Sequence, residues 1–283
     1  MTPAPLQKAP LAYENADFID SPDGRLIRIM AEYQEPLVRF RRERIADTIV
    51  FFGSARFHDP EAVDHNNELA VEAGRYYNDA RTLSRLISTW SKALPGPRHR
   101  FVVTSGGGPG IMEAANRGAY DAGAKSIGLN IKLPFEQFPN PYITPELNFE
   151  FHYFFMRKYW FAYLAKALVV FPGGFGTMDE MFELLTLAQT NKLAKKMTII
   201  VYGSEYWKSV LNFEVLAEKG AISAKDLGIF QFADTPEEAF QLLQAGLHAH
   251  IDSPGKLFVE GHPEGQAPSV QELLGPDINK TRP

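Results

Sequence analysis

Hydrophobic positions along the chain form short apolar runs separated by longer segments with helical spacing. The runs, rich in β-branched and aromatic residues, predict strands at 48–52, 101–104, 125–131, 149–155, 167–171, 197–202 and 229–233. Apolar residues recur every three or four positions between them, which predicts helices over 60–94, 111–122, 156–166, 181–193, 206–219 and 236–250. Alternating strands and helices indicate a Rossmann-like three-layer α/β fold, in which helices flank a parallel sheet.

Another helical pattern precedes the first predicted strand. Apolar residues recur from Leu26 to Phe40, and Pro36 is expected to kink or split this helix. Arginines at 39, 41, 42 and 44 make its second half basic. A solvated face or a helix that contacts a partner is the favoured interpretation. We therefore expect an N-terminal helical extension added to a core domain.

A glycine-rich turn follows the predicted strand 167–171. The sequence runs Pro172-Gly173-Gly174-Phe175-Gly176-Thr177-Met178-Asp179-Glu180 into a helix. Unpaired N–H groups at a helix start suit an anion such as phosphate, and glycine lets the backbone approach it. Thr177 adds a hydroxyl, and Asp179 and Glu180 are expected in the first helical turn. The pattern indicates chemistry on a phosphorylated compound, but an ordinary turn whose carboxylates serve the helix dipole explains it about equally well.

Two earlier strands also end in glycine turns. Gly53-Ser54 follows the first strand, and Ser105 to Gly110 follows the second and includes Gly107 and Gly108. The carboxyl ends of parallel strands meet at one edge of the sheet, where ligands bind in such folds. Each glycine turn alone is explained well by an ordinary strand-to-helix connection. The meeting of several such turns at one edge of the sheet is harder to explain in that way. Pro109 interrupts the second turn and no acidic residue ends the next strand, so we predict no NAD site.

Charged residues elsewhere supply further candidates. Arg157 and Lys158 lie near a predicted helix start, where cations oppose the helix dipole. An anionic ligand or a carboxylate such as Glu180 would account for the two cations. An exposed position, with both side chains extending their charged ends into solvent, would account for them equally well. Glu136 lies in a proline- and aromatic-rich loop, 132–148, that is expected to wall a pocket. An exposed surface glutamate is the simpler interpretation of this residue.

Composition excludes several classes of protein. The chain has 283 residues, a net charge of −5 and no cysteine, so disulfides, thiolate catalysis and cysteine-based zinc sites are excluded. The absence of a basic excess argues against nucleic-acid and anionic-membrane partners. The histidines lack metal-ligand spacing, and no run is long enough to span a bilayer. We expect a cytoplasmic protein with no metal and no cofactor.

The motifs together resemble those of the LOG family, the cytokinin-activating phosphoribohydrolases. The segment 172–180 resembles that family's PGGxGTxxE motif, and Met156-Arg157-Lys158 is similar to its second signature. Val50 to Ser54 and Ser105 to Gly123 also resemble their family counterparts. The likeness covers roughly residues 46–250. Many family members were once labelled lysine decarboxylases, but this sequence has no recognisable pyridoxal-phosphate lysine site.

The resemblance implies hydrolysis of a nucleoside 5'-monophosphate to ribose 5-phosphate and adenine or an N6-substituted adenine. Arg157 and Glu180 would be the catalytic pair. The implied substrate site comprises Gly53, Ser54, Gly107, Gly108, Glu136, Met156, Lys158, Gly173, Gly174, Phe175, Gly176, Thr177, Asp179 and Thr186. Cleavage of a ribose–base bond builds positive charge on the sugar, which a carboxylate such as Glu180 stabilises while it positions or deprotonates water.

Several features depart from the plant-type pattern. Met156 directly precedes Arg157, and the segments 26–45 and 60–94 and the tail past 253 are additions. We expect an extension at 1–46, a nucleotide-binding catalytic domain at 47–250 and a loosely held tail at 251–283. A non-catalytic carrier of a phosphorylated ligand, such as molybdenum cofactor, is the main alternative. A regulatory or assembly protein that uses the arginines at 39–44 is the third, and the resemblance implies a homodimer or higher homo-oligomer.

Overall fold

The computed structural model of the chain describes residues 7–62, 67–134, 138–190, 192 and 197–251. Its centre is a seven-stranded sheet whose order is β4-β3-β2-β1-β5-β6-β7. Every neighbouring pair is parallel, which confirms the predicted Rossmann-like three-layer fold. The strands are β1 Thr48–Phe52, β2 Val102–Ser105, β3 Ser126–Ile131, β4 Asn148–Phe151, β5 Ala165–Val170, β6 Thr198–Tyr202 and β7 Phe230–Ala233.

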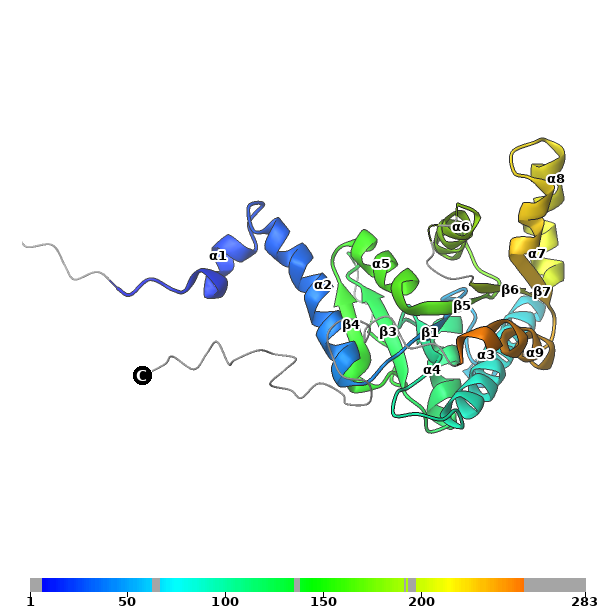
Figure 1. Cartoon of the computed structure of the whole chain (residues 1–283), viewed down its shortest axis with the longest axis horizontal. Helices are drawn as coiled ribbons and strands as arrows, with labels where there is room; N and C mark the ends of the chain where they lie inside the picture. Colours follow the sequence, from blue (N-terminus) through cyan, green and yellow to red (C-terminus); the bar gives the residue numbers. More distant parts are fainter. Residues whose placement is uncertain (1–6, 63–66, 135–137, 191, 193–196, 252–283) are drawn as a thin grey trace, which may run out of the picture.

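Helices cover both faces of this sheet (Figure 1). One face carries α2 Arg25–Arg42, α5 Phe154–Leu164, α6 Phe175–Gln189, α7 Ser204–Val210 and α8 Phe213–Glu218. The other face carries α3 Glu68–Lys92, α4 Ile111–Asp121 and α9 Pro236–Leu247. The short helix α1 Ala16–Ile19 and the first half of α2 stand away from the body (Figure 1). Short 3-10 turns are η1 Ala12–Glu14, η2 Pro60–Ala62, η3 Pro145–Leu147, η4 Ala224–Ile229 and η5 His248–His250.

The central strands are buried on both faces, which explains their continuous apolar sequences. In β1, Val50 and Phe52 pack with the α2, α5 and α6 layer, whereas Ile49 and Phe51 pack with the α3, α4 and α9 layer. The central strands β2, β1, β5 and β6 therefore separate two hydrophobic cores. Among the described residues no helix has the length and apolar character needed to cross a membrane.

The strand order reverses direction at β1, which has β2 on one side and β5 on the other. Loops that leave adjacent strands in opposite directions open a crevice at such a point, and ligands of these folds bind there. Backbone hydrogen bonds join the loops: Ser54 N donates to Pro172 O at 3.0 Å, and Ile111 N donates to Ser54 O at 3.0 Å. The predicted convergence of the three glycine turns is thus confirmed.

The structure corrects the expected break at Pro36. The helix α2 runs without interruption from Arg25 to Arg42, with Pro36 inside it. Proline cannot donate to the carbonyl of Glu32, one turn earlier. The indole of Trp160 on α5 donates to that carbonyl at 3.0 Å instead, so the lost helical bond is replaced by a tertiary one.

The basic half of α2 is not simply a solvated face. Arg39 donates to the backbone oxygens of Glu146, at 2.8 Å, and Asn148, at 3.0 Å. Its guanidinium also lies 4.1 Å from the centre of the Phe149 ring. Arg39 therefore attaches α2 to the start of β4. The interpretation of these arginines as a solvated or partner-contacting face is wrong for Arg39.

Two expected helix boundaries also change. The predicted helix 206–219 is two helices, α7 and α8, because Leu211 is extended and the Asn212 side chain accepts from Val215 N to cap α8. The helix α6 begins at Phe175, so Asp179 and Glu180 lie in its second turn and not in its first. Glu136 and the tail from 252 lie outside the described residues.

Candidate active site

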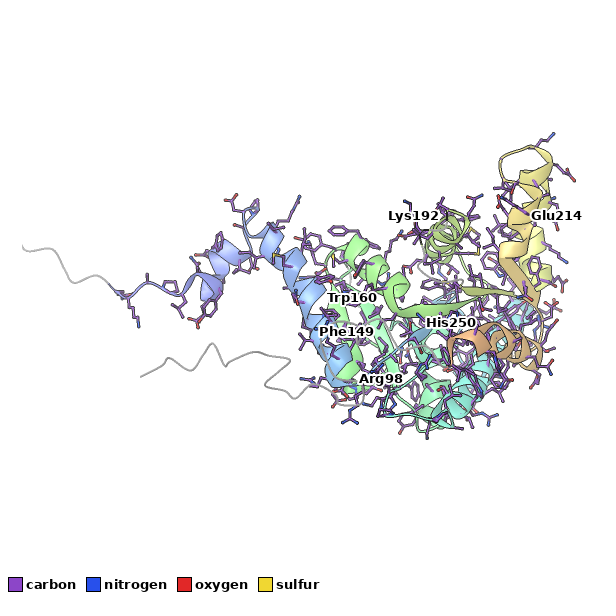
Figure 2. The ribbon with its side chains drawn as sticks, viewed as in Figure 1. Arg98, Phe149, Trp160, Lys192, Glu214 and His250 are labelled. Carbon is purple, nitrogen blue, oxygen red and sulfur yellow. The ribbon has the colours of Figure 1, made fainter. Side chains whose placement is uncertain are left out.

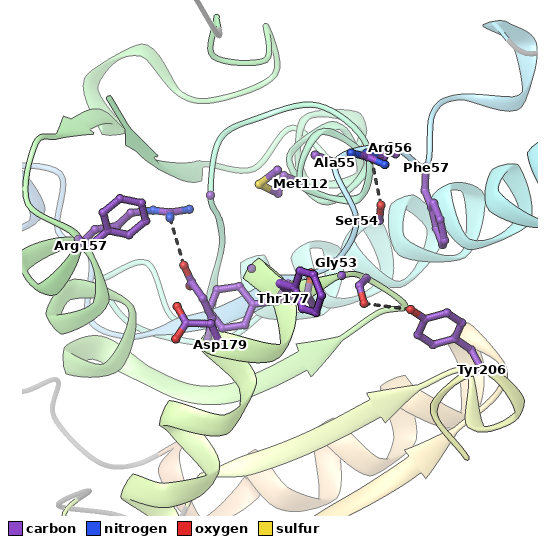
Figure 3. Close-up of a pocket in the computed structure, with 18 residues that line it drawn as sticks. Gly53, Ser54, Ala55, Arg56, Phe57, Met112, Arg157, Thr177, Asp179 and Tyr206 are labelled. Atoms are coloured by element: carbon purple, nitrogen blue, oxygen red, sulfur yellow. Dashed lines mark hydrogen bonds and ion pairs between the residues drawn. The ribbon is translucent and has the colours of Figure 1, made fainter. Parts of the chain in front are cut away.

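A cavity of about 680 Å³ opens at the crevice beside β1 (Figure 3). The loop after β1, residues 53–57, forms one wall, and the turn after β5 with the start of α6 forms another. Gly106, Met112, Phe154, Arg157 and Tyr206 complete the lining. The residues that the sequence predicts to bind phosphate and those it predicts to be catalytic therefore share one cavity.

Arg157 and Glu180 form a buried ion pair on the wall of this cavity. Only 9% of Arg157 and 8% of Glu180 is exposed, and Arg157 Nη1 donates to Glu180 Oε1 at 3.1 Å (Figure 3). Arg157 Nε donates to the backbone oxygen of Leu129 at 2.7 Å, which fixes the plane of the guanidinium. The two predicted catalytic side chains thus come from different helices, α5 and α6, and are in contact on the wall of the cavity.

One oxygen of the Glu180 carboxylate has no partner in the described part of the protein. Its Oε2 is buried and has no hydrogen-bond partner among the described residues. Burial raises the pKa of the Glu180 carboxyl to about 7, and the opposing charge of Arg157 only partly offsets it. A pKa close to the working pH is the property that a general base needs. A buried, unpartnered oxygen beside a cavity also calls for a hydrogen bond from something bound there.

The glycines of the 172–177 turn differ in what surrounds them. A Cβ on Gly173 would lie 2.2 Å from Thr177 Oγ1, so this position is glycine because of the fold. A Cβ on Gly174 or Gly176 would meet no atom within 4 Å. Both line the cavity, so the space beside them is free for a ligand. The protein itself does not require glycine at these two positions, whereas close approach of a ligand to the backbone would.

The start of α6 faces the same space. Gly174 is its N-cap residue and no side chain caps the helix, which runs for 15 residues. Its first N–H groups belong to Phe175, Gly176 and Thr177, and all three residues line the cavity. An uncapped helix start with open glycines beside it can hold a phosphate. Tyr206 steadies the turn because its hydroxyl donates to Gly173 O at 3.0 Å (Figure 3).

The other glycine turns contribute unequally. Gly53 and Ser54 line the cavity, as predicted, but Gly107 and Gly108 do not. Gly107 has a φ of +76° and donates its N–H to Ser105 Oγ, while the carbonyls of both glycines accept from the Asn140 amide. They shape the turn and do not reach the cavity.

Gly106 is the member of that turn that lines the cavity, and nothing in the sequence distinguishes it from the glycines beside it. A Cβ at this position would lie 2.6 Å from Arg157 Nη2 and 2.7 Å from Met112 Sδ. Glycine at this position therefore leaves room for the Arg157 guanidinium, which packs against the turn.

The remaining predicted residues fall into two groups. Phe175 and Asp179 line the cavity, whereas Met156 is 7% exposed and packs in the core. Lys158 bridges Asp179 and Glu183 at 2.9 Å each and so ties α5 to α6 a second time, outside the cavity lining. Thr186 is exposed and its hydroxyl donates to Phe182 O, so it is not brought to the cavity.

Sequence reasoning missed several lining residues: Arg56, Phe57, Met112, Phe154 and Tyr206. Arg56 and Phe57 follow the Gly53-Ser54 turn directly, so proximity to that motif was an available signal. Tyr206 lies far along the chain and had none. Within the described ranges no group of three or more histidine, aspartate or glutamate side chains is placed to hold a metal ion.

Comparisons with known proteins bear on these residues. A family model described as "Possible lysine decarboxylase" matches residues 112–243, which include Arg157 and Glu180. A cytokinin riboside 5'-monophosphate phosphoribohydrolase of Rhodococcoides fascians is 30% identical over 164 residues, covering 51% of this chain and 81% of that protein. A probable enzyme of the same name from Oryza sativa subsp. japonica is 28% identical over 160 residues, covering 53% of this chain and 70% of that protein.

Among solved structures, the molybdenum-cofactor (Moco) carrier protein of Chlamydomonas reinhardtii is similar. It is 19% identical with a TM-score of 0.44, and the match covers 72% of this chain and 99% of that protein.

Proposed function

The chain belongs to the LOG family of cytokinin riboside 5'-monophosphate phosphoribohydrolases, and we propose that it hydrolyses a nucleoside 5'-monophosphate. The N-glycosidic bond between C1' of the ribose and the base nitrogen breaks, and water supplies the new oxygen on C1'. The products are a free base and ribose 5-phosphate. We propose AMP or an N6-substituted AMP as the substrate.

The observation that carries this proposal is the position of the Arg157–Glu180 pair in the same cavity as the open turn 174–177. The turn supplies uncapped amide groups for the 5'-phosphate. The pair supplies a buried carboxylate that lines the cavity, and one of its oxygens has no hydrogen-bond partner among the described residues. One substrate carrying both a phosphate and a bond to be hydrolysed accounts for both features.

Glu180 is proposed to act on the attacking water. As the bond to the base lengthens, positive charge develops at C1', and an ionised Glu180 stabilises it. The Glu180 carboxylate accepts the proton of the water that attacks C1'. The departing base takes up a proton from solvent and Glu180 returns its proton to solvent, so charge and atoms balance. Removal of the buried carboxylate therefore affects the transition state more than substrate binding.

Arg157 is proposed to orient Glu180 and keep part of it ionised. The guanidinium remains protonated at all working pH values, although burial lowers its pKa. Its bond to Leu129 O fixes it, and its bond to Glu180 Oε1 leaves Oε2 without a partner in the part of the chain that the structure describes.

A substrate comparison tests the proposal directly. We expect base release from AMP or N6-isopentenyl-AMP, measured by chromatography, and much slower release from adenosine, which lacks the phosphate that the turn binds. The ratio of the two nucleotide rates identifies the preferred base. Equal rates for AMP and adenosine would contradict a phosphate site at the turn. Stoichiometric retention of the nucleotide without base release would favour the carrier hypothesis.

Gly176→Ala tests the phosphate cradle without disturbing the fold. A Cβ there meets no protein atom, and alanine in a helix is favoured over glycine by about 0.5–1 kcal/mol, so we expect unchanged or higher stability. The methyl group occupies the space reserved for the ligand, so we expect KM for AMP to rise about tenfold or more, with a smaller change in kcat.

Gly228→Ala is the matched control, because a Cβ at Gly228 also meets nothing within 4 Å and the residue is not part of the cavity lining. It should leave KM unchanged. Both constants are obtained from initial rates, and stability from thermal unfolding. An unchanged KM in Gly176→Ala would mean that the turn does not hold the phosphate.

A further inference from the structure

Arg157 lies on a helix whose own sequence does not stabilise its start. Tyr153, the N-cap residue of α5, makes no side-chain cap, and the first turn contains no acidic residue. The sequence instead places two cations, Arg157 and Lys158, near the positive end of the helix dipole. The stabilisation has to come from elsewhere in the molecule.

It comes from α2. The Glu32 carboxylate accepts from His152 N at 2.7 Å and from Tyr153 N at 3.3 Å. It therefore binds the backbone amides of the two residues that directly precede α5. A carboxylate at this end of a helix also offsets the unfavourable cations. No other acidic side chain bonds to these two amides in the described part of the chain.

The same residue holds α5 at a second point. The backbone carbonyl of Glu32, left without a helical donor by Pro36, accepts from Trp160 Nε1 at 3.0 Å. Trp160 is 2% exposed, and its ring packs on Tyr33 and Phe40 of α2. Figure 2 shows Trp160 and Phe149 beside this helix. Arg157 lies between the two attachment points, one turn before Trp160.

We propose that Glu32 is a positioning residue, which holds α5 so that the guanidinium of Arg157 meets Glu180; this inference rests on the proposed function. The N-terminal helix is then part of the catalytic architecture. Glu32 is not among the residues that line the cavity. It acts through the helix that carries Arg157.

Glu32→Ala is the direct test. It removes the acceptor for both amides, so α5 is held less firmly at its start. A small displacement of a catalytic group costs on the order of tenfold to a hundredfold in rate, and we expect kcat to fall about tenfold with KM within about threefold. Glu32→Gln keeps one acceptor oxygen and should give an intermediate kcat. Glu35→Gln is the matched control, because Glu35 lies on the same helix, pairs with Arg39 and should leave kcat unchanged.

A pH profile separates positioning from general stabilisation. Arg157 and Lys158 face Glu180 from α5, and Asp179 and Glu183 lie on its own helix. When Arg157 is held less firmly, Glu180 ionises at higher pH. The rising limb of kcat/KM should therefore move to higher pH in Glu32→Ala and not in Glu35→Gln. A lower melting temperature with an unchanged profile and kcat would overturn the proposal.

A readout independent of catalysis distinguishes this inference from the proposed function. The chain has three tryptophans, so hydrogen exchange of their indole N–H groups can be followed individually by NMR. We expect faster exchange at Trp160 in Glu32→Ala, with Trp90 unchanged. If the wild type releases no base, the proposed function fails while this exchange still tests the hold on α5. Unchanged exchange at Trp160 would overturn the inference whatever the activity.

Discussion

Glu180→Gln is expected to lower kcat by about 10²–10⁴-fold, the range typical of a lost general acid–base group. The amide keeps the shape of the side chain and its bond from Arg157, but it cannot take a proton from water or stabilise positive charge at C1'. The loss should appear in kcat and kcat/KM alike, with KM little changed. A kcat within a few-fold of the wild-type value would contradict the assignment of Glu180 as the general base.

The stability of the same variant shows that lost activity is not lost folding. The pKa of Glu180 is about 7 in the folded protein and near 4.5 in an unfolded chain. The folded state therefore loses stability relative to the unfolded state as pH rises from 4.5 through about 7. Glutamine does not titrate. At pH 8 we expect Glu180→Gln to be at least as stable as the wild type in urea unfolding.

Arg157→Gln is expected to have the second-largest effect. It leaves the Glu180 carboxyl buried without its cation, so the pKa of that carboxyl rises further above 7 and less of it is ionised at neutral pH. We expect kcat/KM at pH 7 to fall about 10²-fold or more, with partial recovery at higher pH. The measurement is a pH profile from 6 to 9.

The double variant is the control for this prediction. If the two residues act as a unit, Arg157→Gln combined with Glu180→Gln should be no worse than Glu180→Gln alone. Additive losses would contradict an orienting role for Arg157, and so would a profile in Arg157→Gln that keeps its wild-type shape.

The layers of the fold followed from the sequence because the buried strands are nearly unbroken apolar runs. The two faces of β1 require Ile49, Val50 and Phe51 alike to be apolar, which is a strong local signal. The continuity of α2 did not follow. The donor that replaces the one Pro36 lacks is on Trp160, more than 120 residues away, and no local pattern contains it.

The candidate site was predictable to the extent that it lies in motifs. The turn 173–177 follows from its glycines between a strand and a helix, and the pair Arg157 and Glu180 follows from the family resemblance; the structure places them in one cavity. The choice among adjacent glycines was not predictable, because Gly106 is distinguished only by the guanidinium that passes it. Thr186 is implied only by the family resemblance, and its side chain is exposed on α6.

Glu32 illustrates the same limit. Its neighbourhood in the sequence indicates an amphipathic helix and nothing more. Its role depends on α5 lacking a cap of its own, which is visible only when the two helices are placed together.

The most direct test of the central claim is a product balance. Purified protein is incubated with AMP and with N6-isopentenyl-AMP, and free base and ribose 5-phosphate are quantified together, with Glu180→Gln as the control. We expect the two products to appear in equal amounts from at least one nucleotide, and we expect neither product from the variant. Tight one-to-one binding of nucleotide with neither product formed would contradict it.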